Sequence, residues 1–120
     1  MVRATPHFAA LAAYAGRFPY ETWLLPRRHA PRYEQVTADE LDDLARLLRW
    51  LLVRVGEVGG RPAYNFFLHA APWHGPAEQP FHWHWEVLPR MTGTAGFEWA
   101  TGCNVNPVPP EEAAARLRAG

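Results

Sequence analysis

The sequence predicts one α+β domain over residues 1–120, with an antiparallel sheet, one main helix and a short C-terminal helix. Three observations support this fold class. The chain length suits a single domain with its own core. A hydrophobic content of 48% argues against a disordered chain. The expected elements follow the order strands, helix, strands, helix, which is typical of α+β proteins.

Two segments near the N-terminus predict a β-hairpin. Residues 8–14 are apolar and rich in alanine, and by themselves they fit either a helix or a strand. Residues 20–25 are rich in aromatic and β-forming side chains and end at Pro26, which predicts a strand. Residues 16–19 contain glycine and proline, so we expect them to form the turn that joins the two segments.

The clearest helix of the chain is expected to begin after Thr37. Thr37 and Glu40 have the spacing of a capping box, in which each side chain accepts a hydrogen bond from the other residue's backbone amide. Gly56 predicts the end of this helix. Between these points apolar side chains recur at helical spacing; they are Leu41, Leu44, Leu48, Leu51, Leu52 and Val55.

The second half of the chain predicts three more strands and a terminal helix. Residues 63–68 predict a strand, and residues 70–80, with three prolines, predict a loop. Residues 81–90 alternate strictly between two kinds of side chain, which predicts another strand. Residues 97–105 predict the last strand. A short helix is expected near Pro110, because proline and acidic residues suit its first turn.

The alternation in residues 81–90 assigns side chains to two faces of a strand. His82, His84 and Glu86 share one face. The opposite face is expected to meet the core, and it carries Trp83, Trp85 and Val87. Three metal-binding or proton-transferring groups on one face indicate either a metal site or a site that handles phosphoryl groups.

His69 strengthens the metal interpretation. It follows the strand predicted for residues 63–68, so its imidazole converges with those of His82 and His84 if the two strands are neighbours in a hairpin. His-x-His on one strand face is a common geometry for chelating a divalent metal. Three histidines and the Glu86 carboxylate suit zinc or iron(II). We favour this functional site over the simpler alternative, a strand whose histidines are satisfied by water.

A second chemistry fits the same face. A histidine on a strand can attack a phosphate directly, with its neighbours fixing the tautomer. In that interpretation His84 and Glu86 are the catalytic residues, with His84 as nucleophile and Glu86 orienting the imidazole, while Arg90 could pair with a phosphate. Glu86 thus has three open interpretations: metal ligand, imidazole orienter, or a polar residue facing water.

Other conspicuous residues have simpler interpretations. Cys103 is expected to be small and buried, since no neighbouring residue would obviously lower its pKa. Asn65 either faces a ligand or pairs across the sheet. The tryptophans Trp73, Trp83, Trp85 and Trp99 are expected in the core. The remaining histidines are expected at the surface or in caps; they are His7, His29 and His74.

Composition excludes several classes of function. The formal net charge is zero, which argues against a broad nucleic-acid or membrane-surface interface. All basic side chains are arginines, so chemistry that needs a lysine is excluded. The single cysteine excludes an internal disulfide and fits a reducing cytosol. No apolar run approaches the roughly 20 residues that span a bilayer, so we expect a cytoplasmic protein.

Several motifs resemble known families. Residues 24–29 and 36–41 resemble the first half of histidine-triad proteins, and His82-x-His84-x-Glu86 resembles the triad motif with Glu in the third position. The closer similarity is to the C-terminal half of galactose-1-phosphate uridylyltransferase. It runs from about Phe8 to Arg118 and is carried, in order, by residues 18–22, 68–72, 82–84, 96–99 and 109–118.

This resemblance implies a histidine-triad-like fold and a shared active site. In that family the C-terminal half carries a metal site, whose histidines correspond to His69, His82 and His84. A further glutamate ligand and the His-Pro-His nucleophile belong to the N-terminal half, which this chain lacks. The strand after the triad-like motif contacts the sugar phosphate in the family. We accordingly predict Glu98 and Thr101, together with Asn65, as substrate-binding residues.

Three hypotheses about function follow. The first is part of a UDP-glucose:hexose-1-phosphate uridylyltransferase of galactose metabolism, with zinc or iron(II), a UDP-sugar or sugar 1-phosphate as ligand, and either a homodimer partner or the missing N-terminal half. The second is a stand-alone histidine-triad nucleotidyl hydrolase or transferase that uses His84 as nucleophile. The third is a metal-binding dimerisation domain without catalytic activity.

Overall fold

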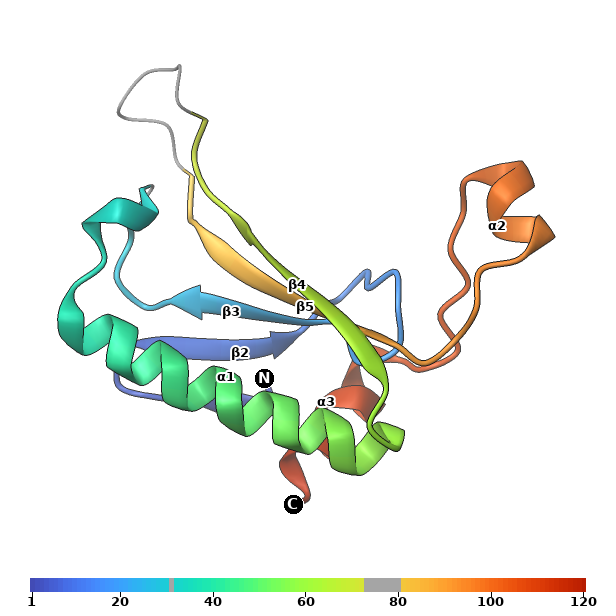
Figure 1. The fold of residues 1–120 in the computed structure, drawn as a ribbon, viewed down its shortest axis with the longest axis horizontal. Helices are drawn as coiled ribbons and strands as arrows, with labels where there is room; N and C mark the ends of the chain where they lie inside the picture. Colours follow the sequence, from blue (N-terminus) through green and yellow to red (C-terminus); the bar gives the residue numbers. More distant parts are fainter. Residues whose placement is uncertain (31, 73–80) are drawn as a thin grey trace.

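A five-stranded antiparallel sheet forms the centre of the molecule, in a computed structural model that describes residues 1–30, 32–72 and 81–120. The strand order is β1-β2-β3-β5-β4 (Figure 1). The strands are β1 (Arg3–Ala4), β2 (Phe8–Ala12), β3 (Thr22–Pro26), β4 (Ala63–His69) and β5 (His84–Arg90). The helices are α1 (Ala38–Gly59), α2 (Gly96–Thr101) and α3 (Pro110–Arg118), with a 3-10 turn over Tyr33–Gln35. The predicted α+β class is confirmed.

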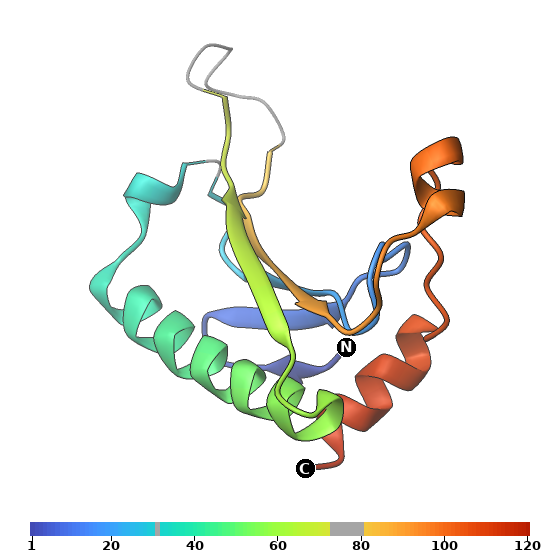
Figure 2. The same ribbon diagram turned by 45° about the vertical axis from the view of Figure 1, so that its right-hand side comes forward.

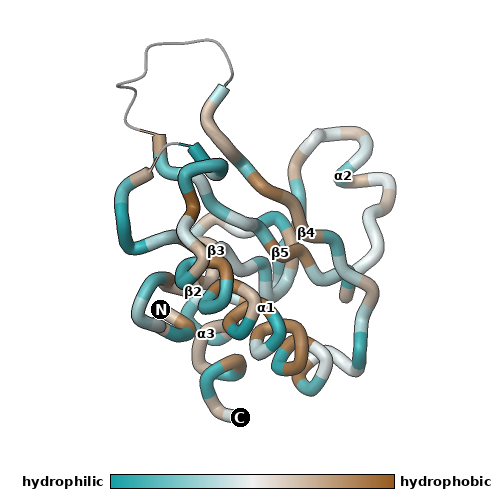
Figure 3. The backbone as a smooth tube through the Cα atoms, turned by 60° about the vertical axis from the view of Figure 1, so that its left-hand side comes forward, coloured by the Kyte–Doolittle hydropathy of each residue, from teal (hydrophilic) through white to brown (hydrophobic). Residues whose placement is uncertain are grey.

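Helices α1 and α3 cover one face of the sheet. Both pack against β2 and against each other, and both lie on the same side of the strands (Figures 1 and 2). The sheet contributes Phe8, Leu24 and Val87 to this core, all fully buried. Helix α1 contributes Leu44, Leu47, Leu51 and Val55. Hydrophobic and hydrophilic positions alternate along α1 in Figure 3, as expected for a helix with one buried side.

The predicted capping box of α1 is confirmed, whereas its predicted end is wrong. The Thr37 hydroxyl accepts from the Glu40 amide at 3.2 Å, and Glu40 Oε1 accepts from the Thr37 amide at 3.1 Å. The helix continues past Gly56 to Gly59. It ends because Gly60 adopts a left-handed conformation with φ of 70°, which glycine reaches without a steric cost.

The expected N-terminal hairpin is confirmed, and the second hairpin begins later than expected. Strands β2 and β3 pair antiparallel along their whole length. Strands β4 and β5 also pair antiparallel, with His69 opposite His84. Strand β5 starts at His84, although the strand was predicted from residue 81. Trp73 and His74 lie outside the described residues.

The strand predicted for residues 97–105 is wrong. Residues 96–101 form α2, because local hydrogen bonds close a helical turn: Glu98 Oε2 accepts from the Ala95 amide, and left-handed Gly102 ends the helix. Helix α2 stands away from the sheet (Figure 1). As a consequence Trp99 is 78% exposed and Cys103 is exposed, so both predictions of burial are also wrong. Trp83 is fully buried and Trp85 packs at the edge of the core, as predicted.

A buried arginine joins α1 to α3. Arg54 of α1 donates from Nε to the Leu117 carbonyl and from Nη2 to the Arg116 carbonyl, each at 2.9 Å. These carbonyls lie in the last turn of α3, where helix carbonyls lack partners within the helix. Within the described residues, no helix is both long and apolar enough to cross a membrane.

The Glu40 carboxylate links β3 to the start of α1 and predicts a pH dependence. Burial by itself raises the pKa of Glu40, but hydrogen bonds from Arg28 and Thr37 outweigh this effect and lower the pKa below its ordinary value. A lowered pKa in the folded state means that the charged form stabilises the fold at neutral pH. This stabilisation is present above the unfolded pKa of about 4.3 and is lost as the pH falls through the folded pKa.

We therefore expect Glu40→Gln to lower the free energy of unfolding by about 1 kcal/mol at pH 7. The difference from the wild type should shrink as the pH falls from 5 to 3, because acid removes the same charge. Urea unfolding followed by circular dichroism at each pH measures both quantities. Glu34→Gln, at an exposed position, is the matched control and should change stability by less than about 0.5 kcal/mol. A constant difference at all pH values would contradict the prediction.

Candidate functional site

The candidate site lies on the sheet face opposite α1 and α3. Cross-strand partners have side chains on the same face, and β5 pairs Glu86 with both Trp23 of β3 and Phe67 of β4. The next pair on this face is His84 with His69. The register of three strands therefore brings Glu86, His84 and His69 together, as the alternation in the sequence predicted for the first two.

The three polar side chains form a compact cluster. Glu86 Oε1 lies 3.1 Å from His84 Nε2 and 3.4 Å from His69 Nε2. One ligand atom from each residue lies within 4.8 Å of the others. Glu86 is only 4% exposed, so it does not face water, which was one of its three open interpretations. His69 is the most exposed of the three.

Aromatic stacking holds the His84 ring in place. The Trp23 ring stacks on His84 with a centroid distance of 4.7 Å and an angle of 18° between planes. On the other side His69 stacks at 5.2 Å and 7°. With Trp23 and His69 on its two faces, His84 can neither tilt nor rotate without disturbing a neighbour, so its ring nitrogens have fixed directions.

The backbone fixes the tautomer of His84. His84 Nδ1 lies 3.1 Å from the His82 carbonyl oxygen, which can only accept a hydrogen bond, so Nδ1 carries a proton. In a neutral imidazole Nε2 then presents a lone pair, and this lone pair faces Glu86 Oε1 at 3.1 Å. Two acceptors in contact repel each other. The arrangement is stabilised by a positive charge between them, either a proton on Nε2 or a metal ion.

The second oxygen of Glu86 has its own partner. Arg17, from the turn between β2 and β3, places Nη2 3.1 Å from Glu86 Oε2. The same guanidinium group lies 3.6 Å from Glu21 Oε1. The sequence did not indicate a role for Arg17, because a contact across 69 positions leaves no periodic pattern. Its only signal is a charged side chain within a predicted hairpin turn.

The two separations between Glu86 Oε1 and the imidazole nitrogens fit a divalent metal ion. Nitrogen and oxygen ligands lie about 2.0–2.2 Å from zinc, so two ligands on a tetrahedral ion are about 3.3 Å apart. The distances of 3.1 and 3.4 Å around Glu86 Oε1 match this value. Two imidazoles and one carboxylate are also a ligand set that zinc and iron(II) accept while keeping further positions open.

His82, a predicted metal ligand, lies apart from this cluster. His82 Nε2 is 2.7 Å from the Pro26 carbonyl oxygen, to which it donates. Its ring lies beside that of His29, with centroids 5.3 Å apart. The structure therefore brings together His69, His84 and Glu86 of the candidate ligands, while the His82 ring contacts the Pro26 carbonyl at the end of β3.

The three predicted substrate-binding residues lie at two separate places, on β4 and on α2. Asn65 is exposed on β4 and shares the face of His69, with Phe67 between them. Glu98 and Thr101 both belong to α2. Their polar side-chain atoms make local bonds: Glu98 accepts from Ala95, and Thr101 donates to the Phe97 carbonyl. Figure 1 shows α2 on the opposite side of the molecule from the end of β4 that carries His69.

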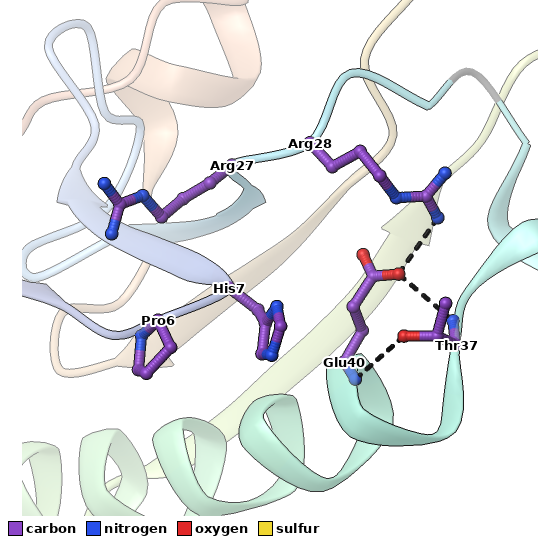
Figure 4. A pocket seen from close by; sticks show the side chains of 6 residues that line it. All are labelled: Pro6, His7, Arg27, Arg28, Thr37 and Glu40. Atoms are coloured by element: carbon purple, nitrogen blue, oxygen red, sulfur yellow. Dashed lines mark hydrogen bonds and ion pairs between the residues drawn. The ribbon is translucent and has the colours of Figure 1, made fainter.

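A cavity of about 550 Å³ lies at the start of α1 (Figure 4). Arg28 donates to Glu40 Oε1 at 2.9 Å, while Glu40 Oε2 has no hydrogen-bond partner among the described residues. That oxygen is sealed from water, so a ligand in the cavity does not reach it in this conformation. The lining residues are Pro6, His7, Arg27, Arg28, Thr37 and Glu40. Two of these residues, Thr37 and Glu40, form the N-terminal cap of α1. We therefore interpret the contacts around this cavity as structural, since they hold the start of the helix in place.

Comparison with known proteins identifies relatives along the whole chain. Residues 1–118 match the family described as galactose-1-phosphate uridyl transferase, C-terminal domain. ADP-glucose phosphorylase of Arabidopsis thaliana is 32% identical over 98% of this chain and 34% of its own length. Galactose-1-phosphate uridylyltransferase of Thermotoga maritima is 30% identical over 98% of this chain and 39% of its own length. The chain thus spans about a third of the length of the curated relatives it matches.

Solved structures agree with this placement. The crystal structure of the Arabidopsis ADP-glucose phosphorylase with bound ADP-glucose has a TM-score of 0.93 and 30% identity, covering 99% of this chain and 39% of that chain. A zinc-bound histidine triad protein from Mycobacterium smegmatis has a TM-score of 0.70 and 20% identity, covering 98% of this chain and 80% of that chain. At that identity the likeness concerns the fold alone, and it confirms the expected histidine-triad-like sheet.

Proposed function

Because this chain belongs to the galactose-1-phosphate uridyl transferase C-terminal domain family, we propose that it supplies the C-terminal part of a nucleotidyltransferase. We propose a UDP- or ADP-sugar and a sugar 1-phosphate as its substrates; the names of the relatives give ADP-glucose and galactose 1-phosphate. The observation that carries the proposal is the cluster of His69, His84 and Glu86, in which a buried carboxylate faces two imidazoles. We assign this cluster the role of a zinc or iron(II) site.

The proposed ligand set differs from the histidine-only set of His69, His82 and His84 that the family resemblance implied. His69 and His84 keep their predicted role, and Glu86 takes the place of His82, because His82 Nε2 already donates to Pro26. A bound ion would supply the positive charge that Glu86 and the His84 lone pair require, and would tie β4 to β5 at the end of their hairpin. Glu86 supplies the negative charge of the site, and Trp23 keeps His84 aimed at it.

The two ligand sets predict different results for two variants. We expect the wild-type chain to bind about one zinc ion, and Glu86→Gln to weaken binding about 100-fold, because it removes a charged ligand. His82→Ala should change zinc affinity little. Competition titration with a chromophoric chelator, together with metal analysis, measures both. If His82→Ala loses zinc and Glu86→Gln keeps it, the histidine-only set is correct and ours is wrong.

We propose that the nucleophile of nucleotidyl transfer comes from outside this chain. His84 Nε2 faces Glu86 Oε1, so a phosphorus atom approaching Nε2 would first have to displace the carboxylate.

One observation favours the second candidate function, a stand-alone nucleotidyl hydrolase. The His82 carbonyl holds a proton on His84 Nδ1, which leaves Nε2 as the basic nitrogen, and a histidine nucleophile needs such a nitrogen.

A chimera tests the proposed function. In it this chain replaces the matching C-terminal third of the Arabidopsis ADP-glucose phosphorylase. We expect the chimera to turn over ADP-glucose, and Glu86→Gln in the chimera to lower kcat/KM by about 10-fold or more. Glu34→Gln is the control and should leave kcat/KM unchanged. A folded, metal-loaded chimera without turnover would count against the proposal.

A labelling experiment with this chain alone distinguishes the stand-alone enzyme from the proposed function. The chain is incubated with a nucleotide sugar that carries a label in its α-phosphate. Our proposal expects no covalent label on the chain. A label that depends on His84 and is absent from His84→Ala would instead support a stand-alone enzyme with His84 as nucleophile.

We further propose that the rest of such an enzyme docks against β4. In the part of the chain that the structure describes, β4 is an edge strand, with β5 on one side and unpaired backbone groups on the other. Tyr64 and Phe66 on this strand are 44% and 46% exposed. Beside them an apolar groove of about 530 Å³ is lined by Ala45, Leu48, Arg49, Leu52, Val53 and Tyr64. An open edge next to an apolar groove suits continuation of the sheet into a partner domain.

A charge in this groove should weaken docking. Mixed with the N-terminal two thirds of the Arabidopsis relative, the wild-type chain is expected to form a complex in analytical ultracentrifugation. Val53→Arg should raise the Kd about 10-fold, because it buries a charge in the apolar groove. Leu41→Arg, an exposed position outside the groove, is the control. If the chain alone self-associates and Val53→Arg weakens that self-association, the groove binds a second copy of this chain and the proposed partner domain is wrong.

A further inference from the structure

We propose that Arg17 is a positioning residue for Glu86, which makes Glu86 a single-oxygen ligand. By occupying Oε2, Arg17 leaves only Oε1 for the two imidazoles and for an ion between them. This inference rests on the proposed metal site and adds a residue that the family comparison does not assign.

The geometry divides the two carboxylate oxygens between different partners. Arg17 Nη2 lies 3.1 Å from Glu86 Oε2, whereas both imidazoles contact Oε1. Glu86 is 4% exposed, and the Arg17 side chain is 48% exposed. The guanidinium group thus lies between the buried Glu86 carboxylate and the solvent. A carboxylate held by a charge-assisted hydrogen bond on one oxygen cannot turn freely to offer both oxygens to an ion.

Arg17 is itself held by a second buried carboxylate. Glu21 is 4% exposed, and its Oε2 accepts from the Arg17 backbone amide at 2.7 Å. Glu21 Oε1 lies 3.6 Å from Arg17 Nη2 and accepts from the Trp23 indole at 3.2 Å. Since Trp23 stacks on His84, the contacts close a ring that runs from Glu21 through Arg17, Glu86, His84 and Trp23 back to Glu21.

A distant segment fixes the turn that carries Arg17. Asn106, between α2 and α3, donates its side-chain amide to the carbonyls of Gly16 and Phe18, at 3.0 and 3.2 Å. These two residues flank Arg17 in the sequence. The backbone of Arg17 is therefore held on both sides, and its side chain reaches Glu86 from a defined starting point. A fixed starting point is what a positioning residue needs, because a mobile arginine would lose much of its effect to entropy.

Charge explains why the site needs a cation here. Glu21 and Glu86 place two buried carboxylates on the same face, and Arg17 contacts both of them. Without Arg17 the two negative charges would repel each other, and Glu86 would be free to rotate and present both oxygens. The coordination of an ion would then change even if its ligand residues stayed the same, since a carboxylate binds ions with either one or two oxygens.

Cobalt(II) is the probe for this effect, because its visible absorption reports the coordination number. We expect the wild-type chain to bind cobalt with intense visible bands. Arg17→Met should give weaker bands, because a second carboxylate oxygen joins the ion and raises its coordination number. Arg17→Lys, which keeps a cationic donor near Oε2, should restore the wild-type spectrum. Arg46→Met is the control, since Arg46 pairs with Asp42 on exposed α1.

The outcomes separate this inference from the proposed function. If the wild-type chain binds no cobalt, the metal site itself is wrong and the role of Arg17 falls with it. If the wild type binds cobalt and Arg17→Met has the same spectrum, the role of Arg17 alone is overturned. Should Arg17→Met fail to fold by circular dichroism, Glu21→Gln replaces it. That variant weakens the contacts that hold Arg17 without removing the arginine. We expect the same spectral change to a smaller extent. An unchanged spectrum would again overturn the inference.

Discussion

The buried carboxylate of Glu86 is the constraint on which the candidate site depends. A carboxylate that is removed from water must be compensated by hydrogen bonds and positive charge, or it takes up a proton. Here the compensation comes from Arg17 on one oxygen, while the other oxygen faces two imidazoles. The site is therefore organised around a negative charge, and the histidines, the tryptophan and the arginine are arranged about it.

The sheet makes this arrangement possible because one of its faces packs in the core and the other carries the candidate site. One face carries Phe8, Leu24 and Val87 under α1 and α3, and this packing supplies the core. In each strand the alternate residues point to the opposite face of the sheet, where the polar cluster lies. The cluster therefore does not interrupt the core. A shift of one residue in the β3–β5 register would move Glu86 to the helix side, where it would be unpaired. Core packing and the site therefore enforce the same register.

The sequence predicts those parts of the structure that depend on local periodicity or local hydrogen bonds. The alternation around His84 and Glu86 assigned their face, and Thr37 with Glu40 marked the start of α1. The strand predicted for residues 97–105 is wrong, because the contacts of Glu98 and the left-handed Gly102 close a helix away from the sheet. Arg17 and the Pro26 carbonyl, which engage Glu86 and His82, reach them across 69 and 56 positions, and no periodicity reports such contacts.

The position of the cluster connects the proposed site with the proposed docking edge. His69 is the last residue of β4, and β4 is one of the two edge strands of the described sheet. Of the three cluster residues, His69 is also the one with the least burial to hold it. A domain that pairs with β4 would order the strand up to this residue and so reduce the entropy that His69 loses on binding an ion. In return, an ion held by His69 and His84 would stiffen the edge that the domain must recognise. Binding of the ion and docking of the partner would then favour each other, as thermodynamic linkage requires of two events that order the same strand.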